Sequence, residues 1–410
     1  MSLSVTKNCP DCGSAPTSHW SERMEARISY YVFPFFNIFN TWGHFFGRIL
    51  SPLTRRIFPY LIKLLVVLKV IQIKNEPDES NNWRSKVLWE EANKRGIKIT
   101  ELRPFGKYVD NFWAEYRGEK IFFDGLPRPK NKVYSSLDWI DNKTEMAKRF
   151  LAQGFPVAKG GIVTNFRQAK KLFQKLSKPV ITKPNEGSRS RHTTIHITNE
   201  DELRIGFDKV KQLSPWVAIQ EELVGPVYRA TVINKKLVAI LRRDPACVYG
   251  DGISNIKELV MKENNNPLRH GPLFHELVLD SEATVELGYQ NLSVDSIPGL
   301  EQRVTLGTKT SRGSGGSIVD VTDVTHEDNK KLFNAVGKYL DYPYVGIDFI
   351  ISDIKKSWVL TPRSGIIECN SLPFIDLHHF PLQGKPINVA GAIWDFIYPV
   401  SPGKLFTDVK

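Results

Sequence analysis

Two carboxylates and one amide in the last quarter of the chain have the spacing of a site for a hard cation. Asp348 lies in the apolar run 344–353, and Glu368 and Asn370 lie in a second run, 365–373. Both runs predict β-strands, and residues two apart in a strand face the same side of a sheet, so Glu368 and Asn370 point together. If the strands are neighbours, Asp348 joins them, and three such oxygen donors suit Mg²⁺. Ion pairing with basic residues is the alternative, but burying these groups in apolar strands without a cation is costly, which favours the metal.

A lysine and the loop after it form a second group, suited to phosphate. The apolar strand predicted over 180–182 leads into Lys183, and the loop that follows is rich in Gly, Ser and Arg. A lysine at a strand end binds phosphate as a point charge, and backbone N–H groups of such a loop can surround phosphate oxygens. Further on, the run 216–225 is a strand that enters an acidic turn. Backbone groups at such a turn could hold the edge of an adenine ring.

The elements that must position these groups alternate between helices and strands. Apolar periodicity, with Gly, Pro and Asn at the boundaries, predicts helices over 85–96, 142–153 and 166–176. It predicts strands over 97–102 and up to Val163. Two hairpins are also predicted, one of 112–116 with 120–123 and one of 227–234 with 237–243. This pattern indicates an α+β protein with mixed sheets, and not a doubly wound parallel sheet. We divide the chain into a polar N-terminus (1–27), an apolar, aromatic and basic helical segment (28–74), a linker (75–82), a small α/β domain (83–140), a larger domain (141–400) and a tail (401–410).

Composition sets the N-terminal segments apart from the rest. A chain of 410 residues with 41% apolar content can form two or three domains with sizeable cores, and wholesale disorder is excluded. Residues 1–74 hold nine basic and three acidic residues, half of the total net charge of +12, and eleven aromatic residues crowd into 30–60. Such a mixture fits a helical hairpin lying in a membrane interface or, as the favoured alternative, a helical cap packed on the protein body or across a homodimer. Basic runs are too short to favour nucleic acid.

Cysteine usage indicates a reducing compartment. The chain has four cysteines (Cys9, Cys12, Cys247 and Cys369), too few for a disulfide scaffold. Cys9 and Cys12 have the spacing of half a zinc knuckle, and His19 is a third ligand within reach, but a second cysteine pair is missing, so a free pair is the favoured interpretation. The first twenty residues lack the apolar core of a secretory signal. We therefore expect a cytoplasmic protein, with membrane association through 28–74 left open.

The order of these parts resembles the ATP-grasp superfamily. The likeness is greatest to the ligase domain of cyanophycin synthetases and of bifunctional glutathione synthetases. It rests on the runs 228–229, 241–259, 315–323 and 368–373 and on 378–384, with the segment Pro-Ala-x-Val-x-Gly-Asp-Gly at 245–252 the most specific. It covers about 143–400, while 83–140 resembles the domain that precedes it. No Mur-ligase-type domain is seen, so a complete cyanophycin synthetase is not expected.

The resemblance implies an ATP-grasp fold of two α+β subdomains that grip ATP, and an ATP-dependent carboxylate–amine ligase acting through an acyl phosphate. Carried over by position, the resemblance implies phosphate contacts for Lys143, Lys183, Gly187, Ser188 and Arg189, and an adenine hinge at Glu221, Glu222 and Leu223. It implies a Mg²⁺ or Mn²⁺ site at Asp348, Glu368 and Asn370. It also implies substrate binding by Arg229 and His378, and catalytic roles for Arg243, Lys183 and His378. A structural histidine is an equal alternative for His378. Arg242 is expected to face away from Arg243, because neighbouring residues of a strand alternate.

Two departures from the family pattern bear on the nucleotide. Glycines are usual where this chain has Ser190 and His192, and the residue that often contacts the ribose is Val227 rather than an acid. Side chains in the loop restrict its backbone and crowd the phosphates. Two alternatives to the ligase therefore remain: a phosphotransferase on the same scaffold, and a membrane-associated ATP-binding protein that has lost turnover.

Overall fold

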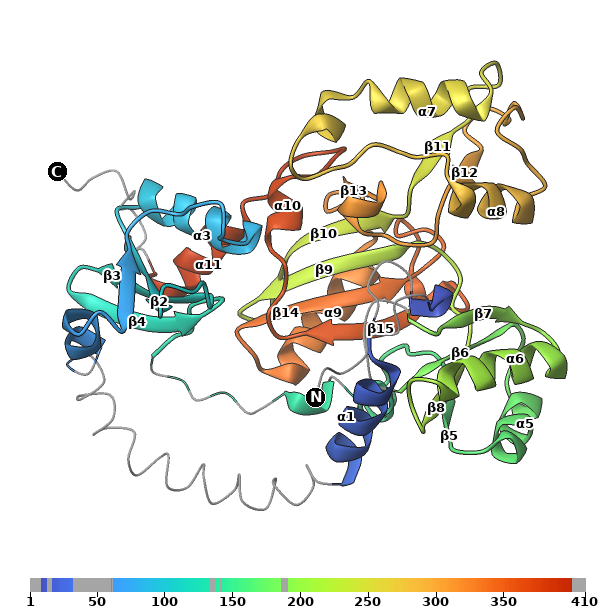
Figure 1. Cartoon of the computed structure of the whole chain (residues 1–410), viewed down its shortest axis with the longest axis horizontal. Helices are drawn as coiled ribbons and strands as arrows, with labels where there is room; N and C mark the ends of the chain where they lie inside the picture. The colour runs from blue at the N-terminus through green and yellow to red at the C-terminus, as the bar shows by residue number, and fades with distance from the viewer. Residues whose placement is uncertain are drawn as a thin grey trace.

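A computed structural model describes residues 9–12, 17–31, 60, 62–130, 132, 134, 137–140, 142–185 and 191–399. Figure 1 shows three sheets with helices packed on them and a further lobe built mainly of helices. Among the helices that the structure describes, none is both long enough and apolar enough to span a bilayer. The predictions for Gly187, Ser188 and Arg189 lie outside the described residues, as does most of the predicted segment 28–74.

The first sheet has four antiparallel strands in the order β1-β2-β3-β4, with bounds Ile71–Lys74, Lys98–Pro104, Asn111–Tyr116 and Glu119–Asp124. Helix α3 (Trp83–Lys94) packs on it and begins at Asn82, whose side chain accepts a hydrogen bond from the Ser85 amide. The helix, strand and hairpin predicted here are therefore present. Strand β1, however, lies inside the segment 28–74 that the sequence predicts to be helical.

The C-terminal helix completes this first unit. Helix α11 (Val389–Ile397) packs against α3, and the indole of Trp394 donates to the Leu88 carbonyl at 2.9 Å. Apolar side chains of α3, α11 and β2–β4 share one core with residues at the ends of β9, β10 and β14. The first unit is thus continuous with the central sheet.

The central sheet carries the predicted cation ligands. Its order is β13-β10-β9-β14-β15, with bounds Ser317–Asp320, Lys236–Asp244, Val227–Ile233, Tyr344–Ile350 and Gly365–Asn370. Every strand pairing in it is antiparallel, as in the other sheets described, so the expectation of mixed sheets is wrong. Helix α9 (Glu327–Leu340) covers one face and forms an apolar core with it. The predicted hairpin is β9–β10, and it turns through two residues with positive φ, Asn234 (46°) and Lys235 (67°).

A smaller lobe holds the predicted phosphate and adenine groups. Its sheet has the order β5-β8-β6-β7, with bounds Gly160–Val163, Val217–Glu221, Val180–Pro184 and Thr194–Ile197, and α5 (Phe166–Lys175) and α6 (Glu200–Lys211) pack on it. Helix α4 (Lys143–Ala152) precedes it, with Asn142 as its N-cap. The helices and strands predicted over 142–176 thus form within one or two residues of the expected bounds. Near this lobe lie two N-terminal elements, η1 (Pro10–Cys12) and α1 (His19–Tyr31).

A further lobe is inserted between β10 and β13. It contains β11 (Cys247–Tyr249), α7 (Ile256–Asn264), η3 (Pro267–His270), α8 (Ser281–Tyr289), β12 (Arg303–Thr305) and η4 (Arg312–Ser314) around a small apolar core of its own. Figure 1 shows this lobe above the central sheet, on the side opposite the smaller lobe. After β15, the short helix α10 (Asp376–His379) returns the chain to the region between β10 and α3.

Candidate active site

The three predicted cation ligands lie on one face of two neighbouring strands. In the register of β14 and β15, Asp348 pairs with Glu368, and Gly346 pairs with Asn370. Residues that pair directly share a face, as do residues two apart, so both carboxylates and the amide project together. On the other side of β14, Asp348 pairs with Arg229 of β9. We call Arg229, Arg243, Asp348, Glu368 and Asn370 the sheet-face site.

A buried ion pair lies at the centre of the sheet-face site. The guanidinium of Arg229 donates two hydrogen bonds to the Asp348 carboxylate, one of them from Nη2 to Oδ2 at 2.7 Å. Both side chains are almost completely buried. Burial alone would lower the pKa of Arg229, but the charge of Asp348 and its hydrogen bonds raise it. Asp348 is therefore paired with Arg229, while Arg229 makes no hydrogen bond to Glu368 or Asn370 among the described contacts.

Arg243 approaches the same carboxylate from β10. Its Nη1 lies 4.0 Å from Asp348 Oδ2. Burial lowers the pKa of Arg243; Asp348 opposes this shift, and the charges of Arg229 and Arg312 add to it. Arg242, in contrast, donates to Asp244 at 2.7 Å, so it belongs to an ion pair on the opposite face of the strand, as the alternation predicts. Arg243 therefore faces the carboxylates.

The two predicted phosphate lysines lie close enough to influence each other electrostatically. Lys183, in β6, has its pKa lowered to about 8, because burial removes water from the ammonium group and the charge of Lys143 repels it, while Glu368 acts in the opposite sense. Lys143 is the first residue of α4, beside Thr144, whose hydroxyl donates to Asn185 at 2.9 Å. Among the described residues, Glu368 has no hydrogen-bond or ion-pair partner. The smaller lobe thus presents positive charge toward the acidic end of the sheet-face site.

At the predicted adenine hinge, the amides of Glu221 and Glu222 already donate to the carbonyls of Lys159 (2.8 Å) and Pro179 (3.0 Å), and their side chains also bond within the protein. The Glu221 carboxylate accepts from the Ser177 amide at 3.0 Å, and Glu222 accepts from the His196 amide at 2.8 Å. Leu223 packs against β15, where a methyl group at Gly365 would stand 3.2 Å from its Cδ1. Within the part of the chain that the structure describes, the Leu223 N–H finds no acceptor. The hinge therefore offers a backbone donor and apolar cover.

His378 is a buried histidine held by one hydroxyl. Its Nε2 lies 2.7 Å from Thr231 Oγ1, and only 3% of its surface is exposed. Burial, aided by the charge of Arg229, lowers its pKa to about 3, so the imidazole is neutral at physiological pH and a weak base. This geometry supports the structural alternative for His378 rather than a role as proton acceptor.

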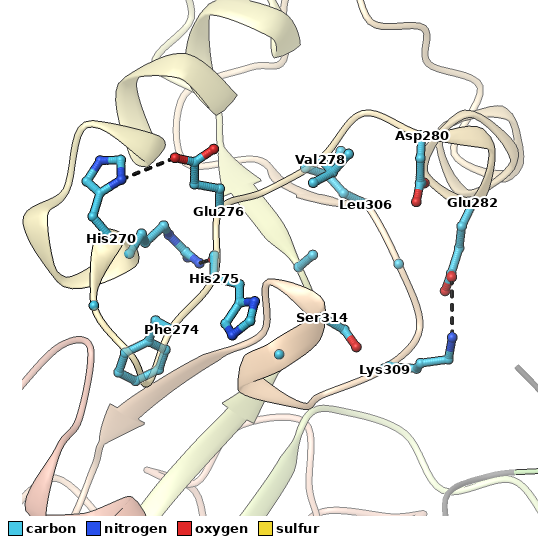
Figure 2. Close-up of a pocket in the computed structure, with 15 residues that line it drawn as sticks. His270, Phe274, His275, Glu276, Val278, Asp280, Glu282, Leu306, Lys309 and Ser314 are labelled. Carbon is cyan, nitrogen blue, oxygen red and sulfur yellow. Dashed lines mark hydrogen bonds and ion pairs between the residues drawn. The ribbon is translucent and has the colours of Figure 1, made fainter. Parts of the chain in front are cut away.

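A pocket of about 660 Å³ lies in the inserted lobe (Figure 2). Its lining combines acidic and basic groups: His270 pairs with Glu276 at 3.1 Å, and Lys309 with Glu282 at 3.5 Å. In Figure 2, Ser314 of η4 points toward the open space between these pairs. This pocket was not predicted from the sequence, because its lining comes from several short helices and the loops between them, and only their packing brings these residues together.

Element η4 links the pocket to the sheet-face site. Arg312 begins η4 and pairs with the buried Asp376 of α10 at 2.6 Å, and its charge contributes to the lowered pKa of Arg243. One carboxylate oxygen of Asp376 and one guanidinium nitrogen of Arg312 have no partner in the described part of the chain. Neither Arg312 nor Asp376 was predicted as a site residue, because the sequence around each of them has no motif that indicates a site. Buried polar atoms without partners are typical of positions that meet a ligand or water.

Known proteins resemble the chain over most of the described residues. No family model matches it. The chain is 31% identical over 261 residues to the cyanophycin synthetase of Trichormus variabilis, covering 62% of this chain and 29% of that protein. It is 29% identical over 326 residues to the glutathione biosynthesis bifunctional protein GshAB of Listeria innocua, covering 77% of this chain and 41% of that protein.

The fold is similar to that of a solved relative. The crystal structure of a bifunctional glutathione synthetase from Pasteurella multocida superposes with a TM-score of 0.58 at 25% identity, covering 77% of this chain and 43% of that one. The chain spans less than half the length of these relatives. These matches confirm the predicted resemblance to the ATP-grasp superfamily and the α+β fold that it implies.

Proposed function

We propose that the protein is an ATP-dependent carboxylate–amine ligase that forms an amide bond on an amino acid or small peptide. The observation that carries the proposal is the sheet-face site, in which two carboxylates and an amide lie near Arg243, Lys183 of β6 and Lys143 of α4. Such an arrangement suits the transfer of a charged phosphoryl group between two oxygens, because positive groups surround the position where negative charge shifts. The names of the relatives support a peptide-like product.

The donor set fits a magnesium ion. Glu368, Asn370 and Asp348 offer hard oxygen ligands on one face, and Glu368 is not engaged by any other described side chain. When bound, the ion neutralises charge on the nucleotide phosphates. Asp348 is shared with Arg229, so the arginine fixes the orientation of this carboxylate.

The residues of the chain would act mainly by positioning. Lys143 and Lys183 bind the phosphates, and Arg243 binds the phosphoryl group as it moves. A substrate carboxylate oxygen attacks the γ-phosphorus, the bond from that phosphorus to the bridging oxygen breaks, and ADP leaves. An amine nitrogen then attacks the acyl carbon, phosphate leaves with the bonding electron pair, and the amine proton passes to solvent. His378, neutral and held by Thr231, positions the neighbouring β9 rather than taking this proton.

The pocket beside η4 would bind an acid or amine substrate. Its lining offers both signs of charge, which suits a zwitterionic amino acid or a peptide end better than a purely anionic compound. The ion pair of Arg312 and Asp376 lies next in the chain to the pocket residue Gly313, and each partner has one polar atom without a hydrogen bond in the described part of the chain. The charge of Arg312 also acts on Arg243, so a substrate in this lobe would lie on the side of the sheet-face site.

The proposal is tested by incubating the purified full-length chain with ATP, Mg²⁺ and a panel of amino acids and dipeptides. ADP release should need both an acid and an amine, and mass spectrometry should find a condensation product in equal amount. Phosphorylation of one compound without an amine would show a phosphotransferase instead. Tight ATP binding without ADP formation across the panel would show a binding protein without turnover.

A further inference from the structure

Four side chains from distant parts of the chain meet outside the sheet-face site. Cys9 precedes η1 and Cys12 ends it, His19 begins α1, and His192 follows β6 and the predicted phosphate loop. One ligand-type atom from each of them lies within 4.8 Å of all the others. We call these four residues the thiol–imidazole cluster. From the sequence, Cys9 and Cys12 have the spacing of half a zinc knuckle with His19 within reach, a free pair is the favoured interpretation, and His192 is only a departure in the predicted phosphate loop.

The distances within the cluster match those around a tetrahedral zinc ion. His192 Nε2 lies 3.6 Å from Cys9 Sγ and 3.5 Å from Cys12 Sγ, and His19 Nε2 lies 3.3 Å from Cys12 Sγ. With Zn–S near 2.3 Å and Zn–N near 2.0 Å, tetrahedral angles place ligand sulfur and nitrogen about 3.5 Å apart. The two rings stand edge to face, with centroids 4.9 Å apart, so both can point one nitrogen at a common centre.

The ligand atom of His192 is oriented by a second hydrogen bond. Its Nδ1 lies 2.8 Å from the Lys209 carbonyl and donates to it, which leaves Nε2, the nitrogen beside both sulfurs, as the basic one. A histidine that binds a metal usually donates its other ring N–H in this way. Only 1% of His192 is exposed, and its backbone has a φ of 50°, a conformation uncommon among residues other than glycine. The ring is therefore held in place for a ligand.

Contacts around the cluster hold the two parts of the chain together. The His192 amide donates to the Asp11 carbonyl at 3.1 Å, and the Asp11 carboxylate pairs with Lys209 at 3.0 Å. Beside them, Arg191 pairs with Glu22 of α1 at 2.8 Å. These contacts join η1 and α1 to the start of β7 and to α6, so the four ligand atoms are brought together by packing of ordered elements.

We propose that Cys9, Cys12, His19 and His192 bind one Zn²⁺ as a closed structural site. Two thiolates and two imidazoles are soft and borderline donors that select zinc over magnesium or calcium. Four protein ligands leave no open position, so the ion serves structure and not catalysis. The bound ion would attach η1 and α1 to the smaller lobe at His192, which follows the residues that the sequence assigns to phosphate binding.

The test measures zinc in the full-length protein purified from zinc-supplemented medium. Elemental analysis should give one zinc per chain after extensive dialysis. The double variant Cys9→Ser/Cys12→Ser should lose it, and His192→Ala should bind at least about 100-fold more weakly in competition with a chromophoric chelator, beyond the effect of an outer-shell change. Cys247→Ser and His326→Gln are matched controls, since these residues lie in β11 and before α9, and both should keep the full zinc content.

A measurement on the unaltered chain covers the case in which the variants fail to fold. Cobalt titrated into the metal-free protein should give the intense visible bands of a tetrahedral ion and a sulfur-to-cobalt charge-transfer band, saturating at one ion per chain. Zinc should then displace the cobalt. A wild-type chain without zinc and without these bands would overturn the proposal, as would zinc content that persists in Cys9→Ser/Cys12→Ser.

Discussion

The sheet-face site and the thiol–imidazole cluster both gather groups that can bind a metal, but the chain builds them differently. The first comes from neighbouring strands of one sheet, where register alone aligns Asp348 and Glu368 and where arginines balance the charge. The second joins segments as far apart as Cys9 and His192, 183 positions from each other. The strand pairing that aligns the sheet-face site stays in place whether or not an ion is bound. The junction between the N-terminal segment and the smaller lobe, in contrast, depends on the contacts that hold the two segments together.

This difference predicts opposite consequences of disturbing the two sites. Damage at the sheet face should reduce chemistry and leave the N-terminal segment attached. Removal of zinc should release the N-terminal segment and affect turnover much less.

The largest effect is expected from Glu368→Gln. The amide keeps the shape of the side chain but removes the negative charge that would hold the metal ion and face Lys183. We expect ADP release to fall by about 10²- to 10³-fold, as for other losses of a charge that acts in the transition state. Glu327→Gln, on the exposed first turn of α9, is the matched control and should leave the rate unchanged. Unaltered ADP release in Glu368→Gln would exclude this residue as a metal ligand.

Arg229→Ala should destabilise the fold strongly. It leaves the buried Asp348 carboxylate without its partner, which costs about 3–5 kcal/mol in comparable buried pairs. Lys132→Ala removes one of the two exposed lysines that pair with Asp341, the other being Lys235, and should cost less than about 1 kcal/mol. Urea unfolding gives both free energies. Equal losses in the two variants would mean that the sheet-face ion pair is not isolated from water.

Zinc removal should expose α1 to protease. With a zinc chelator present, trypsin should cut after Arg23 and Arg27 about tenfold faster, which corresponds to about 1.4 kcal/mol of local opening free energy. Cleavage of the central sheet should not change. In Cys9→Ser/Cys12→Ser the chelator should have no further effect, while Cys247→Ser should behave as the wild type. An equal cutting rate with and without zinc would contradict a fastening role.

ATP affinity should decline at alkaline pH. Because the pKa of Lys183 is lowered to about 8, this lysine loses its charge between pH 7 and 9, and ATP binding should weaken by up to about tenfold over that range. Folding stability changes in the opposite direction. Above pH 8, Lys183 is more fully protonated in the unfolded chain, where its pKa is ordinary, than in the folded chain. The contribution of Lys183 to folding stability therefore rises with pH. Calorimetric titration measures the affinity, and Lys183→Arg should flatten its pH profile. A steep decline retained in Lys183→Arg would assign it to another group.

The last prediction concerns the helical residues 60 and 62–67, which precede β1. Ile62 packs with Ile71 and Leu102, while Tyr60 and Val67 are mostly exposed, so one face of this helix covers the sheet and another faces outward. If 28–74 contacts a membrane, the chain should float with vesicles of anionic lipid, and Leu64→Glu/Val67→Glu should weaken binding by about tenfold. Control vesicles of neutral lipid should bind less. A dimer in light scattering, without flotation, would support the packed-cap interpretation instead.

Local patterns in the sequence were enough to predict most helices and strands outside the N-terminal segment, and to predict which side chains share one face of the central sheet. Alternation in the strands around Asp348 and Glu368 fixes which side chains share a face, and Asn82 and Asn142 mark helix starts. The hairpin of β9 and β10 followed from its turn residues for the same reason.

Contacts between distant segments could not be predicted in this way. Nothing near His192 announces that its ring meets Cys9, because the meeting depends on how α1 packs beside α6. The ion pair of Arg312 and Asp376 and the pocket beside it likewise depend on where the inserted lobe lies. Strand β1 was assigned to a helix because its few residues continue an apolar run, and only pairing with β2 makes them a strand.

The bond between Trp394 and the Leu88 carbonyl, 306 positions away, has a consequence for synthesis. On the ribosome, α3 and its sheet emerge well before the helix that completes their core. Until α11 has been made, the apolar side of α3 lacks its cover. This unit therefore cannot finish folding when its own strands are complete, and a nascent chain halted before residue 389 would carry that exposed surface.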